Sequence, residues 1–171
     1  MSNLDLSLQL QDINVFKKRL SLLSANGSSN GKVLAIDYGI KKIGIAVSDE
    51  NRLVSFPQDI LSGIWQDVDV VLKEILFQIE KYNAVAVVFG FPKKLNGELH
   101  DNCNMIFDVA KRINQQYPVL LYDERFSTKL ANRFLTEKNS FLKKNKKKRI
   151  NIYQDDAVSA SIILENVLDM L

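Results

Sequence analysis

An unbroken apolar run at residues 84–89 (AVAVVF) constrains the fold of this chain more than any other feature. A strand without polar alternation is typical of the centre of a sheet that is covered on both faces. Helical apolar spacing precedes this run at residues 68–79 and follows it at 102–116, and a second apolar run comes at 119–122. Strands joined by helical crossovers lie parallel, so the sequence predicts an α/β domain.

Two β-rich runs come earlier, at residues 33–36 and 43–47, separated by a short segment that contains Asp37 and Gly39. This spacing favours an antiparallel pair. A third short strand is expected at residues 53–56, stopped by Pro57. The predicted sheet is therefore mixed, with an antiparallel meander of three strands plus two parallel strands and with helices on both faces. A last helix is expected from about residue 155 to the C-terminus.

The 171 residues suffice for one domain with a single core. Apolar spacing at residues 13–23 predicts a short helix, and the breaker-rich residues 25–31 predict a flexible linker. We therefore expect residues 1–31 to precede one folded domain at residues 32–171. The sequence has no apolar stretch that could span a bilayer and no signal-peptide pattern, so we expect a cytoplasmic protein without a membrane partner.

The chain has one Cys and one His. They cannot supply an internal disulfide or a four-ligand zinc site, so any bound metal is expected to have carboxylate ligands. His100 and Cys103 have no obvious partner and are most simply loop and helix residues. The net charge of +3 is too small to indicate nucleic acid by itself, but the positive charge is unevenly placed.

Five acidic residues from distant parts of the sequence are predicted at one edge of the sheet, because they lie at the ends of predicted strands or at the start of the last helix. In α/β sheets, ligands bind at the carboxyl ends of the strands. Carboxylates are the ligands that hard divalent cations prefer, and a pair of bridged ions can activate water and stabilise the leaving oxygen of a phosphodiester. The sequence therefore predicts a site for Mg²⁺ or Mn²⁺. The five candidates are Asp37, Asp123, Glu124, Asp155 and Asp156.

Each of these acids has an alternative interpretation. Asp37 could be a turn residue that bonds its own backbone ahead of Gly39. In the last helix, Asp156 shares the apolar face that looks toward the sheet, whereas Asp155 is better placed to cap the N-terminus; both could be capping acids. Strand alternation puts Asp123 and Glu124 on opposite faces, and both remain candidates.

Basic residues predict contacts with phosphates. The run at residues 143–149 could hold phosphates beside the metals or be a solvated loop. Arg125 could bind a phosphate or neutralise Glu124. The expected nucleic-acid contacts are Lys41, Lys42, Arg125, Lys146, Lys147, Lys148 and Arg149.

Four ordered motifs closely resemble the YqgF/RuvX family: VLAIDYGIKKIGIAVSD at residues 33–49, GFP at 90–92 with NG at 96–97, DERFST at 123–128, and DAVSASIIL at 156–164. Several motifs in order are far more specific than any one of them. The resemblance implies an RNase H-like nuclease related to RuvC junction resolvases, which processes the 5′ end of pre-16S rRNA. Lys42 stands where the family usually has Arg.

The resemblance also implies the site residues. The implied catalytic acids are Asp37, Asp123, Glu124 and Asp156, and the expected metal ligands among them are Asp37, Glu124 and Asp156. The expected state is a monomer or homodimer. Branched DNA, as the substrate of a Holliday junction resolvase, and a non-catalytic nucleic-acid-binding module are the alternatives. A kinase or ATPase of the actin type is disfavoured, because that fold needs a second Asp-x-Gly hairpin and a duplicated domain.

Overall fold

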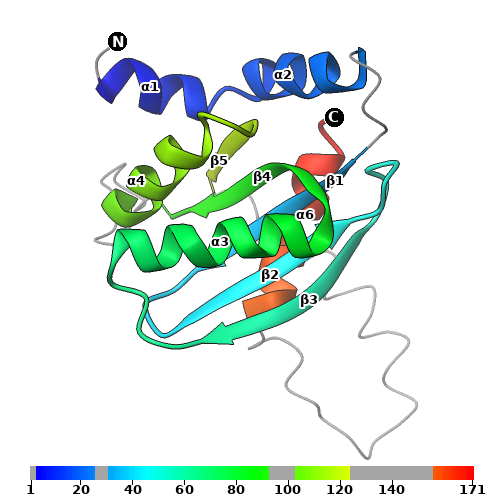
Figure 1. Ribbon diagram of the computed structural model, residues 1–171. Helices are drawn as coiled ribbons and strands as arrows, with labels where there is room; N and C mark the ends of the chain where they lie inside the picture. Colours follow the sequence, from blue (N-terminus) through cyan, green and yellow to red (C-terminus); the bar gives the residue numbers. More distant parts are fainter. Residues whose placement is uncertain (1–2, 26–30, 93–102, 124–155) are drawn as a thin grey trace, which may run out of the picture.

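The protein is described by a computed structural model at residues 3–25, 31–92, 103–123 and 156–171, and its centre is a five-stranded sheet (Figure 1). The strand order in space is β3-β2-β1-β4-β5. The strands are β1 (Lys32–Tyr38), β2 (Lys42–Ser48), β3 (Ser55–Ser62), β4 (Ala84–Phe91) and β5 (Val119–Asp123). β1 is therefore the middle strand, and its residues 33–36 are fully buried.

The strand pairing confirms the predicted mixed sheet. β1 pairs antiparallel with β2 and parallel with β4. β2 pairs antiparallel with β3, and β4 pairs parallel with β5. The antiparallel meander is thus joined to two parallel strands along one side of β1.

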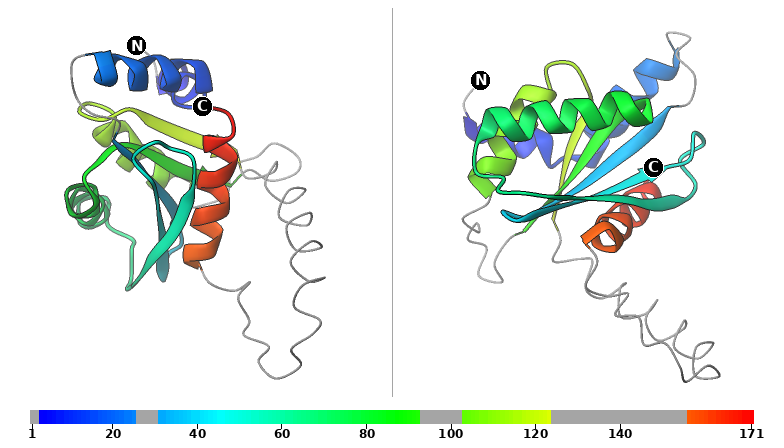
Figure 2. Two further views of the ribbon diagram at one scale, coloured as in Figure 1. Left: turned by 90° about the vertical axis from the view of Figure 1, so that its right-hand side faces the viewer. Right: turned by 60° about the horizontal axis from the view of Figure 1, so that its bottom comes forward.

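Helices cover both faces of this sheet (Figures 1 and 2). On one face, α3 (Val68–Tyr82) and α4 (Cys103–Ile113) pack on one apolar cluster that includes Leu34 and Ile36. On the other face, α6 (Asp156–Leu168) packs on a second cluster that includes Val33 and Ala35. Alternate residues of β1 therefore belong to opposite faces, as expected of a strand.

The third strand differs from the sequence prediction. It was expected at residues 53–56 and stopped by Pro57, but β3 begins at Ser55 and continues through Pro57 to Ser62. β3 is an edge strand, where a residue without an N–H group is tolerated. The pairing with β2 shifts register beside Pro57, which pairs with Ala46, and this irregularity admits the proline.

Two helices, α1 (Asn3–Leu10) and α2 (Ile13–Ala25), precede the sheet, where the sequence predicted only the second. They contact β5 at the edge of the sheet opposite β3. Leu10 belongs to the cluster beneath α3 and α4, and Phe16 and Leu20 belong to the cluster beneath α6. The N-terminal helices thus contribute buried side chains to both faces.

Most of the linker predicted at residues 25–31 and the lysine run at residues 143–149 fall outside the described residues. Within the part of the chain that the structure describes, no helix combines the length and apolar character needed to cross a membrane.

Candidate active site

Asp37 and Asp156 lie close together where β1 ends and α6 begins. Asp37 is the sixth residue of β1 and pairs in register with Gly44 of β2, while Asp156 is the first residue of α6. The alternation of β1 puts Asp37 on the same face as Val33 and Ala35, which is the face that α6 covers.

Gly44 allows the start of α6 to approach β2. A Cβ atom at this position would overlap the backbone carbonyl of Asp156 and would come within 2.9 Å of the nitrogen of Ala157. Ala157 and Ala160 are small and buried on the same side of the helix. The sequence therefore brings Asp156 to the sheet by leaving out side-chain atoms on both contact surfaces.

The electrostatic environment of Asp37 reflects this approach. Burial, and in second place the negative charge of Asp156, raise the pKa of Asp37 from 3.8 to about 6. Two carboxylates that lie close together, one of them largely removed from water, cost folding free energy unless a cation neutralises them. A hard divalent cation is the partner that fits this donor set.

One cationic side chain lies beside the pair. Lys42, the first residue of β2, places its Nζ atom 3.9 Å from Oδ2 of Asp156. Both side chains are accessible to solvent, at 55% for Lys42 and 36% for Asp156. Its neighbour Lys41, in the turn between β1 and β2, is also exposed.

The structure places Asp123 differently. It ends β5, is half-buried, and pairs in register with Phe91. The preceding Tyr122 packs against the cluster beneath α6, and Leu121 belongs to the opposite cluster. By the alternation of the strand, Asp123 points to the face of α3 and α4, away from the face of Asp37.

The remaining predicted site residues lie outside the described residues. They are Glu124, Arg125, Lys146, Lys147, Lys148, Arg149 and the alternative acid Asp155. Among the residues that the structure does describe, no three His, Cys, Asp or Glu side chains form a metal-binding group. The described part of the site is therefore the pair Asp37 and Asp156 with Lys42.

A brace of hydrogen bonds that sequence reasoning missed holds the turn between β1 and β2. The backbone N–H groups of Gly63 and Trp65 donate to the carbonyl oxygens of Lys41 and Ile40, at 3.1 and 2.8 Å. The hydroxyl of the buried Tyr38 donates to the carbonyl oxygen of Trp65. We call these contacts the turn brace. No local sequence pattern indicated it, because the brace joins the turn to Gly63 and Trp65, more than 20 residues further along the chain.

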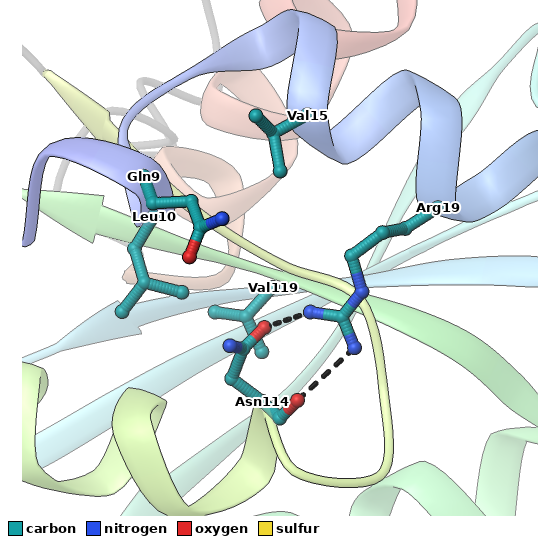
Figure 3. Close-up of a pocket in the computed structure, with 6 residues that line it drawn as sticks. All are labelled: Gln9, Leu10, Val15, Arg19, Asn114 and Val119. Atoms are coloured by element: carbon teal, nitrogen blue, oxygen red, sulfur yellow. Dashed lines mark hydrogen bonds between the residues drawn. The ribbon is translucent and has the colours of Figure 1, made fainter. Parts of the chain in front are cut away.

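A separate pocket of about 250 Å³ lies between the N-terminal helices and the segment after α4 (Figure 3). The guanidinium of Arg19 donates to the side-chain and backbone oxygens of Asn114 and, at 3.3 Å, to the carbonyl oxygen of Tyr117. Burial lowers the pKa of Arg19. The Arg19 guanidinium thus donates to neutral oxygens of the protein itself, and these hydrogen bonds anchor α2 to the segment after α4.

Known proteins resemble this chain both in fold and in sequence. The structure is similar to Thermus thermophilus RuvC in complex with a Holliday junction substrate, with a TM-score of 0.54 and 17% identity, over 82% of this chain and 94% of that chain. A second Thermus thermophilus RuvC structure gives a TM-score of 0.51 at 16% identity, over 81% and 95% of the two chains. At these identities the likeness shows the RNase H-like fold alone.

Sequence relatives are closer. Proteins from Rickettsia akari and Rickettsia felis, both named "Putative pre-16S rRNA nuclease", are 39% and 40% identical to this chain. Each match covers 83% of this chain and 88% of the relative. Residues 31–170 match the family described as "RuvX: Holliday junction resolvase". With that match over most of its length, from β1 to the end of α6, the chain belongs to the RuvX family.

Proposed function

We propose that this RuvX-family nuclease is metal-dependent, hydrolyses phosphodiester bonds, and acts in processing the 5′ end of pre-16S rRNA. The observation that carries the proposal is that Asp37 and Asp156 lie close together beside Gly44. Burial and the charge of Asp156 raise the pKa of Asp37, and a divalent cation would stabilise both carboxylates. The names of the Rickettsia relatives support the substrate.

We propose Mg²⁺ or Mn²⁺ as the cation, held by Asp37, Asp156 and Glu124. Glu124 is preferred to Asp123 as the third ligand, because Asp123 lies on the strand face that α3 and α4 cover, away from Asp37. When bound, the metal would supply Lewis-acid stabilisation of the phosphate and a water activated as nucleophile.

The chain's own residues would hold and orient the nucleic acid. Lys41 and Lys42 lie on the braced turn beside the acids and would contact phosphates next to the scissile bond. Arg125 and the basic run Lys146, Lys147, Lys148 and Arg149 are proposed as further phosphate contacts. Such contacts add affinity without reading sequence.

The proposal is tested by cleavage of a 5′-extended 16S rRNA precursor and of a four-way DNA junction, each with Mg²⁺, with Mn²⁺ and with EDTA. Asp37→Asn and Asp156→Asn should each abolish cleavage, because the amide keeps the shape but lacks the charge that a hard cation needs. Asp169→Asn is the matched control on the exposed end after α6 and should cleave normally.

The outcomes separate the alternatives. Cleavage of the junction in preference to the precursor would favour a Holliday junction resolvase, the second candidate, which the family description supports. Binding without cleavage in any metal would make the chain a nucleic-acid-binding module. Full activity of Asp37→Asn would overturn the metal site itself. A cytoplasmic location and a monomeric or homodimeric state also stay predictions.

The basic run has its own test. Replacing Lys146, Lys147, Lys148 and Arg149 by Ser should weaken binding of all sequences alike, and the log-log salt slope should fall by about 0.7 to 0.9 for each phosphate that is no longer neutralised. The catalytic constant should change little, because the run contributes no carboxylate. An unchanged slope would make the run a solvated loop.

A further inference from the structure

Among the described residues, Lys42 is the cationic side chain that forms an ion pair with one of the two acids. It opens β2, two residues before Gly44, and Gly44 lies between Asp37 in the neighbouring strand and the start of α6. The ammonium is 3.9 Å from a carboxylate oxygen of Asp156. The position of Lys42 is therefore fixed by the same strand that holds the two acids together.

We propose that Lys42 is an exchangeable counter-ion of the acid pair. Without a divalent cation its ammonium partly neutralises Asp156, and when the metal binds, Lys42 releases this carboxylate and its ammonium turns to a phosphate of the bound nucleic acid. The inference rests on the proposed function, namely that Asp37 and Asp156 hold the metal.

The ion pair between Lys42 and Asp156 has the properties that such an exchange requires. At 3.9 Å and with both side chains open to solvent, the interaction is weak and costs little to break. A lysine has a compact charge on a flexible stem, and it lacks the planar fork that would fix an arginine on a carboxylate. Asp37 has no such ion pair among the described residues; burial, and in second place the charge of Asp156, raise its pKa.

The proposal predicts effects of opposite sign on two ligands. A positive charge beside a cation site repels the incoming metal, so removing the Lys42 charge should tighten Mg²⁺ binding. The same change removes a phosphate contact, so it should weaken nucleic-acid binding. A residue with only a structural role would weaken both or neither.

The experiment is a Mg²⁺ titration of the full chain, labelled with ¹⁵N and free of nucleic acid, followed by the amide shifts of β1, the β1–β2 turn and the start of α6. Lys42→Gln should bind Mg²⁺ about three- to tenfold more tightly than the wild type, as expected for one unit charge several ångströms from a divalent ion in screened water. Lys42→Arg keeps the positive charge, so it should bind Mg²⁺ no more tightly than the wild type.

Lys41→Gln is the matched control. Lys41 carries the same charge, is exposed, and lies one residue further from β2, so its removal should change Mg²⁺ affinity by less than about twofold. Binding of a labelled RNA oligonucleotide is then measured with Ca²⁺ in place of Mg²⁺. Lys42→Gln should weaken this binding by about three- to tenfold, as expected when one charged phosphate interaction is removed.

The outcomes distinguish the inference from the proposed function. If Mg²⁺ binds the wild type and is lost in Asp37→Asn, while Lys42→Gln binds it no more tightly than wild type, the counter-ion role is wrong and the metal site stands. If Asp37→Asn binds Mg²⁺ as the wild type does, or the wild type binds none, the metal site fails and the inference fails with it. The amide spectra show in each case that the variant is folded.

Discussion

Gly44 and Asp156 are in backbone contact across the interface between β2 and α6. A Cβ atom on Gly44 would overlap the carbonyl oxygen of Asp156, so the first turn of the helix lies directly on the strand. Because Asp37 pairs with Gly44 in the adjacent strand, the same contact brings the start of α6 close to Asp37. The missing side chain at Gly44 therefore allows the two acidic residues to lie close together.

Gly44→Ala should damage activity more than stability. The methyl group must push the start of α6 away from β2, because the atoms in its way are backbone. Overpacking of this kind costs about 1–3 kcal/mol of unfolding free energy. We expect kcat to fall at least about tenfold, since small misplacements of catalytic groups are costly. Urea unfolding and Mg²⁺-dependent cleavage measure the two effects.

Gly63→Ala is the control for that substitution. Its Cβ atom would meet ring atoms of Trp65 at 3.1 and 3.2 Å, where a side chain can shift, and no acid is involved. Its kcat should stay within about twofold of wild type, as for a substitution away from the reacting groups. Equal losses in the two variants would argue against the role of Gly44 in placing Asp156.

Asp37→Asn should stabilise the metal-free protein at neutral pH. The folded pKa of Asp37 is raised to about 6, so the stability associated with its protonated form is full below pH 4 and is lost as the pH rises through 6. Raising a carboxyl pKa by this amount corresponds to at most about 3 kcal/mol, and solvent near Asp156 should reduce the gain to about 1–2 kcal/mol.

Urea unfolding of both proteins in EDTA at pH 5.0 and pH 7.5 measures this difference, which should be larger at the higher pH. Adding Mg²⁺ should stabilise the wild type and leave Asp37→Asn unchanged, because only the folded wild type offers the site. A variant that is less stable than wild type at pH 7.5 would show that the carboxylate is not strained in the metal-free fold.

The sequence predicted most of the sheet because its strands carry local signals. The apolar runs that became β1, β2, β4 and β5 are bounded by turn residues, and the helical spacing of α3, α4 and α6 is regular. β3 was misjudged, since the local rule that proline ends a strand does not consider that an edge strand with a register shift can accept it. Pairing across the sheet decided that element.

The site was less predictable than the fold. Periodicity along the last helix assigned Asp156 to the apolar face, and in the structure that face packs on the sheet. The strand alternation around Asp123 was visible, but the face that α6 covers is a tertiary property. The approach of Lys42 to Asp156 and the turn brace both join residues distant in sequence, which no local pattern reveals.

Arg19→Met should show whether α1 and α2 are part of the folded unit, since both helices lie outside the family match at residues 31–170. The change leaves oxygens of Asn114 and Tyr117 without this donor, which costs about 1–3 kcal/mol for partly buried groups. Lys18→Met, at the exposed neighbouring position, should be neutral. Thermal unfolding compares them, and equal midpoints for wild type and Arg19→Met would make the segment an appendage with little role in stability.

Tyr38→Phe tests the turn brace, and through it the assignment of the β1–β2 turn to nucleic-acid binding. The ring stays in the core while the hydroxyl that donates to the Trp65 carbonyl is removed, and this should cost about 1 kcal/mol of stability. Trp65 also holds Ile40 through its backbone N–H group, so loosening it should loosen the segment that carries Lys41 and Lys42.

We therefore expect the apparent KM for nucleic acid to rise by about two- to fivefold with kcat nearly unchanged, the pattern of weakened uniform binding. Tyr82→Phe is the matched control, because its hydroxyl also donates a hydrogen bond, to Asp59 at 2.7 Å, but from the far end of α3. It should lose similar stability with no change in KM. If the two variants share the same KM, the brace is purely structural, and the turn it holds does not position the phosphate contacts.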